Sequence, residues 1–256
     1  MKTRLDKLLV DRGLTPSRER AQALILAGKV LVNEQKIEKA GTSIDSNSTV
    51  RLLGEDLRYV SRGGLKLEKA LEHWQIDLHG KVCLDVGAST GGFSDCMLQH
   101  GAAKVIAIDT GYGQMDFGLR NDPRIRLLEK TNARYIEPID IGEPVDFIAM
   151  DVSFISATLV LPAVMRAASS YPISTRNPAT QIVVLVKPQF EAGRELVGKG
   201  GIVRDESAQR AAVAKVEAAL ADLGCRHTEW IDSPILGGEG NREFLLHAEF
   251  SPPAIR

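Results

Sequence analysis

The nonapeptide DVGASTGGF at residues 85–93 constrains the fold of this chain more than any other segment. It continues the apolar run KVCLDV and leads into a helical pattern near residues 91–100. Glycine permits tight turns and a close approach of the backbone to a ligand, so a strand that enters a helix through such a turn is typical of a ligand-binding α/β domain. We therefore expect a sheet whose strands end at a binding site.

Strand and helix patterns alternate from residue 81 onward. The predicted strands lie near residues 81–86, 104–109, 125–128, 145–150, 181–187, 226–232 and 243–250. The predicted helices lie near residues 91–100, 156–169 and 206–223. Such alternation predicts an α/β fold, in which a mainly parallel, Rossmann-like sheet is covered by helices on both faces.

The first sixty residues have a different pattern. Leu5, Leu8 and Leu9 follow helical spacing up to Gly13, and a second helical stripe runs from Arg18 to Gly28. The segments KVLVNEQKI and STVRLLG then read as short strands. We predict a small α+β domain at residues 1–58, a linker at 59–64 and the α/β domain at 65–256.

The charge of the chain is distributed unevenly between these parts. The net charge is −1, but residues 1–62 contain 12 Lys and Arg against 8 Asp and Glu, whereas the remainder contains 20 against 25. A basic small domain on an acidic body suggests that the small domain faces a polyanion. Scatter of charges over a solvated surface explains the same numbers equally well.

The composition sets limits on location and on metal chemistry. No apolar run approaches the ~18 residues of a membrane span, and the N-terminal segment MKTRLDKLLVDRG lacks the apolar region of a signal peptide. The three cysteines, Cys83, Cys96 and Cys225, show no metal-ligand spacing. We expect a cytoplasmic protein with no membrane partner and no bound metal.

The glycine-rich turn reads G-x-x-x-G-G and not the G-x-G-x-x-G of dinucleotide sites. Asp85 precedes it and would repel a phosphate, whereas S-adenosylmethionine carries an ammonium and a sulfonium group and no phosphate. Asp109 ends the next predicted strand, where ribose hydroxyls need an acceptor. A plain tight turn remains the alternative. The predicted cofactor-binding residues are Asp85, Gly87, Ala88, Ser89, Gly91, Gly92, Phe93, Asp109, Asn132 and Asp151.

Four charged residues stand where a core would not place them: Lys66, Asp151, Lys187 and Glu243. Asp151 and Lys187 end apolar strands, Glu243 opens the last strand, and Lys66 starts a helix after YVSRGG. Charge at such places is costly unless it is paired or used. A single lysine there could extend its amine to solvent, but two strands ending in charge at one edge favour a site.

The segment RLDKLLVDRGLTPSRERAQALILAGKVLVNEQKI resembles the S4 RNA-binding domain, with its R-L-D-x-x-L, S-R-x-x-A and G-x-V-x-V-N patterns. Glu34 replaces the usual glycine after Asn33. The resemblance implies that a basic helical face docks on structured RNA by neutralising phosphates. The predicted RNA-binding residues are Arg4, Lys7, Arg12, Arg18, Arg20, Lys29 and Arg62. A structural cap on the larger domain is the alternative.

The order Lys66, Asp151, Lys187, Glu243, with SRGGLKLEKAL, resembles the FtsJ-like 2′-O-ribose methyltransferases and, over residues 3–250, the hemolysin A-like (TlyA) family. The resemblance implies a seven-stranded sheet with an antiparallel last strand. It also implies S-adenosylmethionine-dependent methylation of a cytidine 2′-hydroxyl in 23S ribosomal RNA, with 16S left open. Lys187 is the predicted proton acceptor, held by Asp151 and Glu243, and Lys66 positions the hydroxyl or a phosphate.

Other functions fit the sequence less well. Methylation of an exocyclic amine uses an (N/D)PP(Y/F) turn where this chain has DVSF, and carbon-5 methylation needs a Pro-Cys nucleophile that the chain lacks. An RNA-binding ribosome-assembly factor with a vestigial methyltransferase domain is the main alternative. A membrane-lytic protein, suggested by the family's older name, would need an amphipathic stretch that the sequence does not offer.

Overall fold

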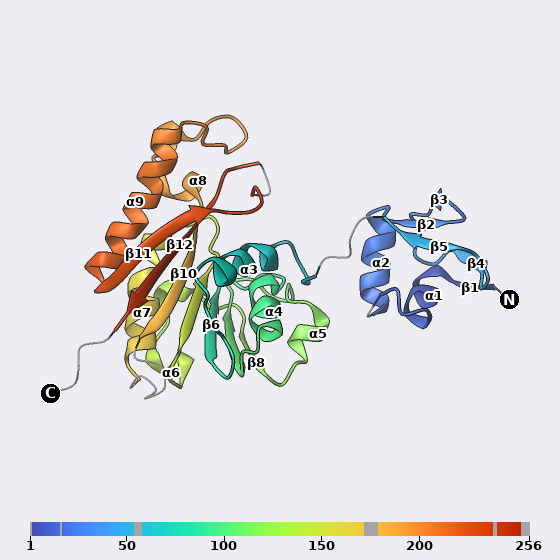
Figure 1. Cartoon of the computed structure of the whole chain (residues 1–256), viewed down its shortest axis with the longest axis horizontal. Helices are drawn as coiled ribbons and strands as arrows, with labels where there is room; N and C mark the ends of the chain where they lie inside the picture. The colour runs from blue at the N-terminus through green and yellow to red at the C-terminus, as the bar shows by residue number, and fades with distance from the viewer. Residues whose placement is uncertain (1, 16, 54–57, 172–178, 238–239, 252–256) are drawn as a thin grey trace. The chain divides into compact units, whose positions relative to one another are not determined.

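The structure is a computed structural model of the 256-residue chain and describes residues 2–15, 17–53, 58–171, 179–237 and 240–251. The chain divides into two compact units, Met1–Leu57 and Arg58–Arg256 (Figure 1). Each unit has its own buried apolar core.

The small unit packs two helices against short strands. Helices α1 (Leu5–Asp11) and α2 (Arg18–Leu26) bury Leu5, Leu9 and Ile25. The strands form two small antiparallel sheets: β1 (Lys2–Arg4) with β4 (Ser43–Asp45), and β2 (Val30–Val32) between β3 (Gln35–Lys36) and β5 (Val50–Leu52). The β1–β4 pair was not predicted, because three-residue strands are too short to show an alternating pattern.

Local residues explain where the two helices begin and end. Ser17 caps α2, since its hydroxyl accepts a hydrogen bond from the Arg20 N–H at 3.2 Å. Gly13 and Gly28 follow the two helices with φ of 67° and 65°, a left-handed conformation that favours glycine. These caps agree with the helix ends predicted from the sequence.

The larger unit contains a seven-stranded sheet in the order β11-β12-β10-β9-β6-β7-β8. Strand β12 runs antiparallel to both of its neighbours, and the pairs from β10 to β8 are parallel. The predicted α/β class and antiparallel last strand are confirmed. The strands are β6 (Val82–Val86), β7 (Lys104–Ile108), β8 (Ile125–Leu128), β9 (Phe147–Met150), β10 (Thr180–Val186), β11 (Cys225–Asp232) and β12 (Phe244–Phe250).

Helices cover both faces of this sheet. Helices α3 (Gly63–His73) and α4 (Gly92–Gln99) pack with one face, and α7 (Leu161–Ser169) and α9 (Glu206–Asp222) pack with the other. Successive strand residues point to opposite faces, so Cys83 joins the α3–α4 core and Leu84 joins the α7–α9 core. The remaining helical segments are short: α5 (Phe117–Arg120), α6 (Pro138–Ile141), α8 (Pro188–Glu191), η1 (Ala133–Tyr135), η2 (Ala157–Leu159) and η3 (Arg194–Leu196).

Residues 59–64, predicted as a linker, belong to the larger unit. Tyr59 is buried in the α3–α4 core, and its hydroxyl donates a hydrogen bond to Glu68 at 2.9 Å. The Val60 N–H donates to the Asp95 carboxylate on α4 at 2.8 Å. The segment was predicted as a linker because YVSRGG contains the glycine and serine typical of linkers. The buried ring of Tyr59 instead anchors it to the larger unit.

No helix in the described parts of the chain combines the length and the apolar character that crossing a membrane requires.

Candidate active site

Three of the four predicted catalytic residues meet at one edge of the sheet because of strand direction. Asp151 follows β9 and Lys187 follows β10, and both strands are parallel. Glu243 precedes β12, which runs the opposite way, so the start of β12 lies at the edge where β10 ends. Lys66 reaches the same place from the first turn of α3.

The four residues form two ion pairs. Lys187 Nζ lies 2.5 Å from Asp151 Oδ1 and donates a hydrogen bond to Ser153 Oγ at 2.7 Å. Lys66 Nζ lies 2.5 Å from Glu243 Oε2. Both lysines and Glu243 are buried, and Asp151 is partly exposed. Two buried amines and two carboxylates thus balance each other's charge, which offsets part of the cost of removing them from water.

This pairing differs from the arrangement expected from the sequence. The sequence analysis assigns both Asp151 and Glu243 to Lys187, whereas the structure pairs Glu243 with Lys66. The reason is the sheet order: β9 is the parallel neighbour of β10, while Glu243 meets the α3 helix that covers this end of β12. The spacing of residues along a sequence does not contain this information.

The turn after β6 requires glycine at several positions. Gly87 has φ 91°, and a Cβ there would lie 2.4 Å from the backbone oxygen of Asp151. A Cβ on Gly92 would lie 2.2 Å from Ser61 Oγ. Gly91 has φ 94° and precedes the first residue of α4. The turn therefore packs directly against the Asp151 backbone and the segment before α3, which a side chain would prevent.

Two cavities open beside this turn and share Gly87, Ser89 and Asp151 as lining residues. The larger, of about 430 Å³, lies within the ~300–1,000 Å³ typical of small-molecule sites. Its polar lining comprises Ser89, Asp109, Thr110, Gln114, Thr131, Asn132, Asp151 and Ser153. The smaller, of about 240 Å³, has the cations Arg62 and Lys66 in its wall.

Asp109 is held as an acceptor at the end of β7. Its two carboxylate oxygens accept hydrogen bonds from the Ser89 N–H at 2.8 Å and the Gly111 N–H at 2.6 Å. Asp109 also lines the larger cavity, and its carboxylate has lone pairs that these two bonds do not use. Asn132 lines the same cavity, and its side chain accepts from the Arg134 N–H at 3.1 Å.

Asp85 differs from the other predicted cofactor-binding residues because it is completely buried and lines neither cavity. It shares the face of β6 with Cys83, and its Oδ2 accepts a 2.6 Å hydrogen bond from Ser94 Oγ on α4. Burial raises the pKa of Asp85 to about 7, the Ser94 hydrogen bond opposes this, and the carboxylates of Asp151 and Asp109 add to it. Among the predicted set, Gly91 also lies outside the two linings.

The larger cavity suits a ligand without phosphate. None of the described residues that line it is Lys or Arg. Asp109 and Asn132 offer acceptors for ribose hydroxyls, and Asp151 offers a carboxylate to a cationic group. This set of donors and acceptors fits S-adenosylmethionine, which carries two cationic groups and no phosphate.

Comparison with known proteins agrees with this geometry. The FtsJ-like methyltransferase family model matches residues 59–250, and the S4 domain model matches residues 3–50. The chain is 43% identical over 246 residues to the 16S/23S rRNA (cytidine-2′-O)-methyltransferase TlyA of Mycobacterium tuberculosis, covering 96% of this chain and 89% of the relative. The chain belongs to the TlyA family of FtsJ-like methyltransferases.

Other TlyA-like proteins are equally similar. A candidate rRNA methyltransferase, YqxC of Bacillus subtilis, is 47% identical over 250 residues, covering 96% of this chain and 85% of the relative. The solved structure of a candidate hemolysin from Streptococcus thermophilus superposes with a TM-score of 0.73 at 44% identity, covering 98% of this chain and 89% of that chain.

Two further residues of this TlyA-family site were missed by the sequence analysis. Ser153 accepts the Lys187 hydrogen bond, and Phe154 lies 92% exposed beside the larger cavity, with φ 64°. The Phe154 ring contacts the Phe190 ring at a tilted angle, with 5.4 Å between the ring centroids. The motif DVSF contains both residues, and an aromatic side chain directly after a strand-end acid is the signal that could have indicated Phe154.

The predicted RNA-binding residues of this TlyA-family chain fall into different environments. Arg4 and Arg18 bond to the buried carboxylate of Asp6, whereas Arg12 donates to the backbone oxygens of Ser46 and Ser48 at 2.6 and 2.8 Å. Lys7 is exposed, Arg20 and Lys29 are partly exposed, and Arg62 is exposed at the smaller cavity of the larger unit.

Proposed function

We propose that this protein transfers a methyl group from S-adenosylmethionine to the 2′-hydroxyl of a cytidine in ribosomal RNA. The proposed substrate is 23S ribosomal RNA, with 16S as a second, and the proposed location is the cytoplasm. The observation that carries the proposal is the pair of buried Lys–carboxylate contacts beside the cavity. Related proteins are named as 16S/23S and as 23S rRNA (cytidine-2′-O)-methyltransferases.

The larger cavity is the proposed cofactor site. Asp109 and Asn132 would accept hydrogen bonds from the ribose, and the Gly87 turn and Asp151 would hold the amino-acid end. When bound, the cofactor supplies an electrophilic methyl group on a sulfonium, so the reaction needs no further activation of the donor. The role proposed for Asp85 is indirect: it supports the turn through Ser94.

Lys187 is the proposed proton acceptor. A 2′-hydroxyl is a weak nucleophile, so its oxygen must lose a proton as the O–CH₃ bond forms and the S–CH₃ bond of the donor breaks, leaving a neutral thioether. That proton would pass to Lys187 Nζ. Lys187 must be in its neutral form to accept this proton, and its contacts with Asp151 and Ser153 would hold the nitrogen in place.

Lys66 and Arg62 are the proposed contacts of the acceptor nucleotide. Both lie in the wall of the smaller cavity, which shares Gly87 and Asp151 with the larger one. Glu243 holds the Lys66 amine in place, and both cations could contact a phosphate flanking the ribose. The exposed Phe154 ring beside Asp151 is suited to stack on an unpaired base.

The test is methylation of defined RNA by the purified full chain. Ribosomal RNA or isolated subunits would be incubated with S-adenosylmethionine labelled in the methyl group. Because 2′-O-methylation blocks alkaline cleavage at one linkage, the label should be recovered in an alkali-resistant dinucleotide containing cytidine. Label in a free base would contradict ribose methylation. RNA binding without any transfer would favour the assembly-factor alternative.

A further inference from the structure

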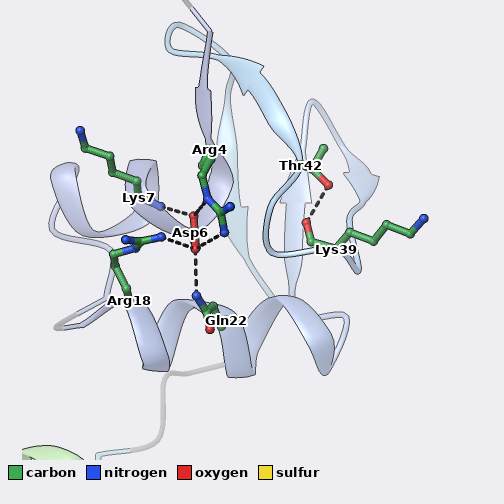
Figure 2. A network of polar contacts seen from close by, with 7 residues as sticks. All are labelled: Arg4, Asp6, Lys7, Arg18, Gln22, Lys39 and Thr42. Carbon is green, nitrogen blue, oxygen red and sulfur yellow. Dashed lines mark hydrogen bonds and ion pairs between the residues drawn. The ribbon is translucent and has the colours of Figure 1, made fainter.

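The small unit contains a completely buried carboxylate, Asp6, which is surrounded by donors (Figure 2). Arg4 donates through Nε and Nη2 to the two oxygens at 3.0 and 2.9 Å. Arg18 Nη2 and Gln22 Nε2 donate to Oδ2 at 3.0 and 2.9 Å, and the Lys7 N–H donates to Oδ1 at 2.9 Å. One carboxylate thus fixes side chains from β1 and α2.

The charge of Asp6 is permanent under ordinary conditions. The hydrogen bond from Arg4 is the main cause that holds the pKa of Asp6 well below its usual range, and Gln22 and Arg18 contribute, while burial opposes them. Guanidinium groups keep their positive charge in the same pH range in which Asp6 is ionised. The contacts of Arg4 and Arg18 with Asp6 are therefore ion pairs throughout that range.

Both arginines are about half exposed. The side chains of Arg4 and Arg18 are 54% and 51% exposed, although each is bonded to a carboxylate that is fully buried. A guanidinium has five N–H donors in a rigid plane, and Arg4 uses two groups and Arg18 one for Asp6. Because the guanidinium group is rigid, these bonds also fix the directions of the donors that Asp6 does not use.

We propose that Asp6 is a positioning residue for RNA binding. It orients Arg4 and Arg18 so that their free N–H groups form one preformed surface for neighbouring phosphates. Ordering two arginines in advance removes an entropy cost that flexible side chains would meet on binding. This inference rests on the proposed function of the small unit as an RNA-binding domain.

Removing the negative charge of Asp6 distinguishes two explanations of its effect on RNA binding: positioning of the arginines, and a change in net charge alone. Asp6→Asn makes the small unit more positive by one charge, so long-range attraction alone predicts tighter RNA binding. Positioning predicts weaker binding, because the arginines lose their shared anchor. The two explanations thus differ in sign and not merely in size.

The experiment measures binding of the full-length chain to a transcript of 23S ribosomal RNA over a range of KCl concentrations. We expect Asp6→Asn to raise Kd about tenfold and to reduce the salt dependence by about one to two phosphate contacts. The matched control is Asp11→Asn, which makes the same charge change at an exposed position at the end of α1. The control should leave Kd equal or lower.

Two further variants keep the test decisive. Changing Arg4→Lys and Arg18→Lys together preserves charge and removes the rigid fork, so it should raise Kd even if Asp6→Asn impairs folding of the small unit. In a chain carrying Arg4→Gln and Arg18→Gln, adding Asp6→Asn should have no further effect on Kd. Circular dichroism and thermal unfolding report on the fold separately.

Three outcomes would overturn the inference. They are an unchanged or lower Kd in folded Asp6→Asn, an unchanged Kd in the double lysine variant, and an equal loss from Asp6→Asn after both arginines have been removed. A wild-type chain that does not bind the transcript would overturn both this inference and the proposed function. Wild-type binding with any of the three outcomes would overturn only the role of Asp6.

Discussion

Two completely buried carboxylates, one in each unit, have opposite surroundings. Asp6 receives two guanidinium groups, and its pKa lies well below the usual range. Asp85 receives the Ser94 hydroxyl, no described residue donates to its Oδ1, and its pKa is raised to about 7. The first carboxylate stays ionised and organises cations around itself, whereas the second takes up a proton near neutral pH.

The cations of the two units differ in the same way. The small unit uses arginine, which cannot release its proton, to present a lasting positive charge. The larger unit places lysine next to carboxylates at the strand ends, and lysine can exchange a proton when its surroundings change. In the proposed function, arginines on Asp6 would dock RNA through permanent charge, and lysine at the strand ends would take part in catalysis through a transferable proton.

The largest effect is expected from Lys187→Arg, which tests this separation directly. Arginine keeps the positive charge beside Asp151 but cannot accept a proton at neutral pH. General-base catalysis contributes roughly 10²- to 10⁴-fold, so single-turnover methylation should fall by about that factor while cofactor and RNA affinities stay near wild type.

The matched control for this variant is Lys215→Arg. Lys215 also pairs with a buried carboxylate, Glu191, but it lies on α9 and lines neither cavity. The Lys215→Arg variant should retain nearly full activity. A rate within a few-fold of wild type in Lys187→Arg would exclude the lysine as the base and leave positioning as its contribution.

The next effect concerns stability at the second pair. Lys66→Met would leave the buried Glu243 without its cation, at an expected cost of about 3 kcal/mol in the free energy of unfolding of the larger unit. Adding Glu243→Leu should recover most of that loss, because neither charge then remains. Urea unfolding of the single and double variants measures this, and equal stability of all four proteins would show that water already solvates the pair.

A smaller, pH-dependent effect is expected from Asp85→Asn. The folded pKa of about 7 exceeds the unfolded value of 3.8, so the folded state holds the extra proton and wild-type stability falls as the pH rises from about 4 to 7. Asparagine cannot ionise. Relative to wild type, the variant should gain about 2 kcal/mol between pH 5 and 7, since one linked proton is worth at most ~1.4 kcal/mol per pH unit. If the free energies of unfolding of wild type and Asp85→Asn changed in parallel with pH, burial would not raise the pKa of Asp85 as assigned.

The smallest effect is expected from Arg12→Ala. Arg12 donates to two backbone oxygens in the β4–β5 turn and lacks the shared carboxylate that holds Arg4 and Arg18. Its loss should lower the stability of the small unit by under about 1 kcal/mol and change the salt dependence of RNA binding little. A salt effect as large as that of Arg18→Ala would place Arg12 among the RNA contacts.

Much of the architecture could be predicted from the sequence. The seven strands of the larger unit and its helices α4, α7 and α9 follow from hydrophobic periodicity, which is a local property. The glycine turn could be predicted too, because few residues other than glycine tolerate the φ of 91° at Gly87. The charged residues at the sheet edge could also be predicted, because they stand at the ends of predicted strands.

The contacts among those residues could not be predicted. Whether Glu243 pairs with Lys66 or Lys187 depends on which strand neighbours which, a property of the assembled sheet. Asp6 looked like an ordinary polar residue of a helix, and its burial arises from α2 packing over it. Tyr59 looked like part of a linker because its partner, Glu68, lies on a helix that had not been assigned in full.

The position of β12 has a consequence for the order in which the protein becomes competent during translation. This strand lies inside the sheet between β10 and β11, yet it is the last strand to be synthesised. Until residues 243–250 emerge from the ribosome, β11 lacks its only strand neighbour in the described sheet and Lys66 lacks its carboxylate. Activity should therefore arise as one of the final events of folding, so a nascent chain that stalls before Glu243 would contain the glycine turn and still be inert.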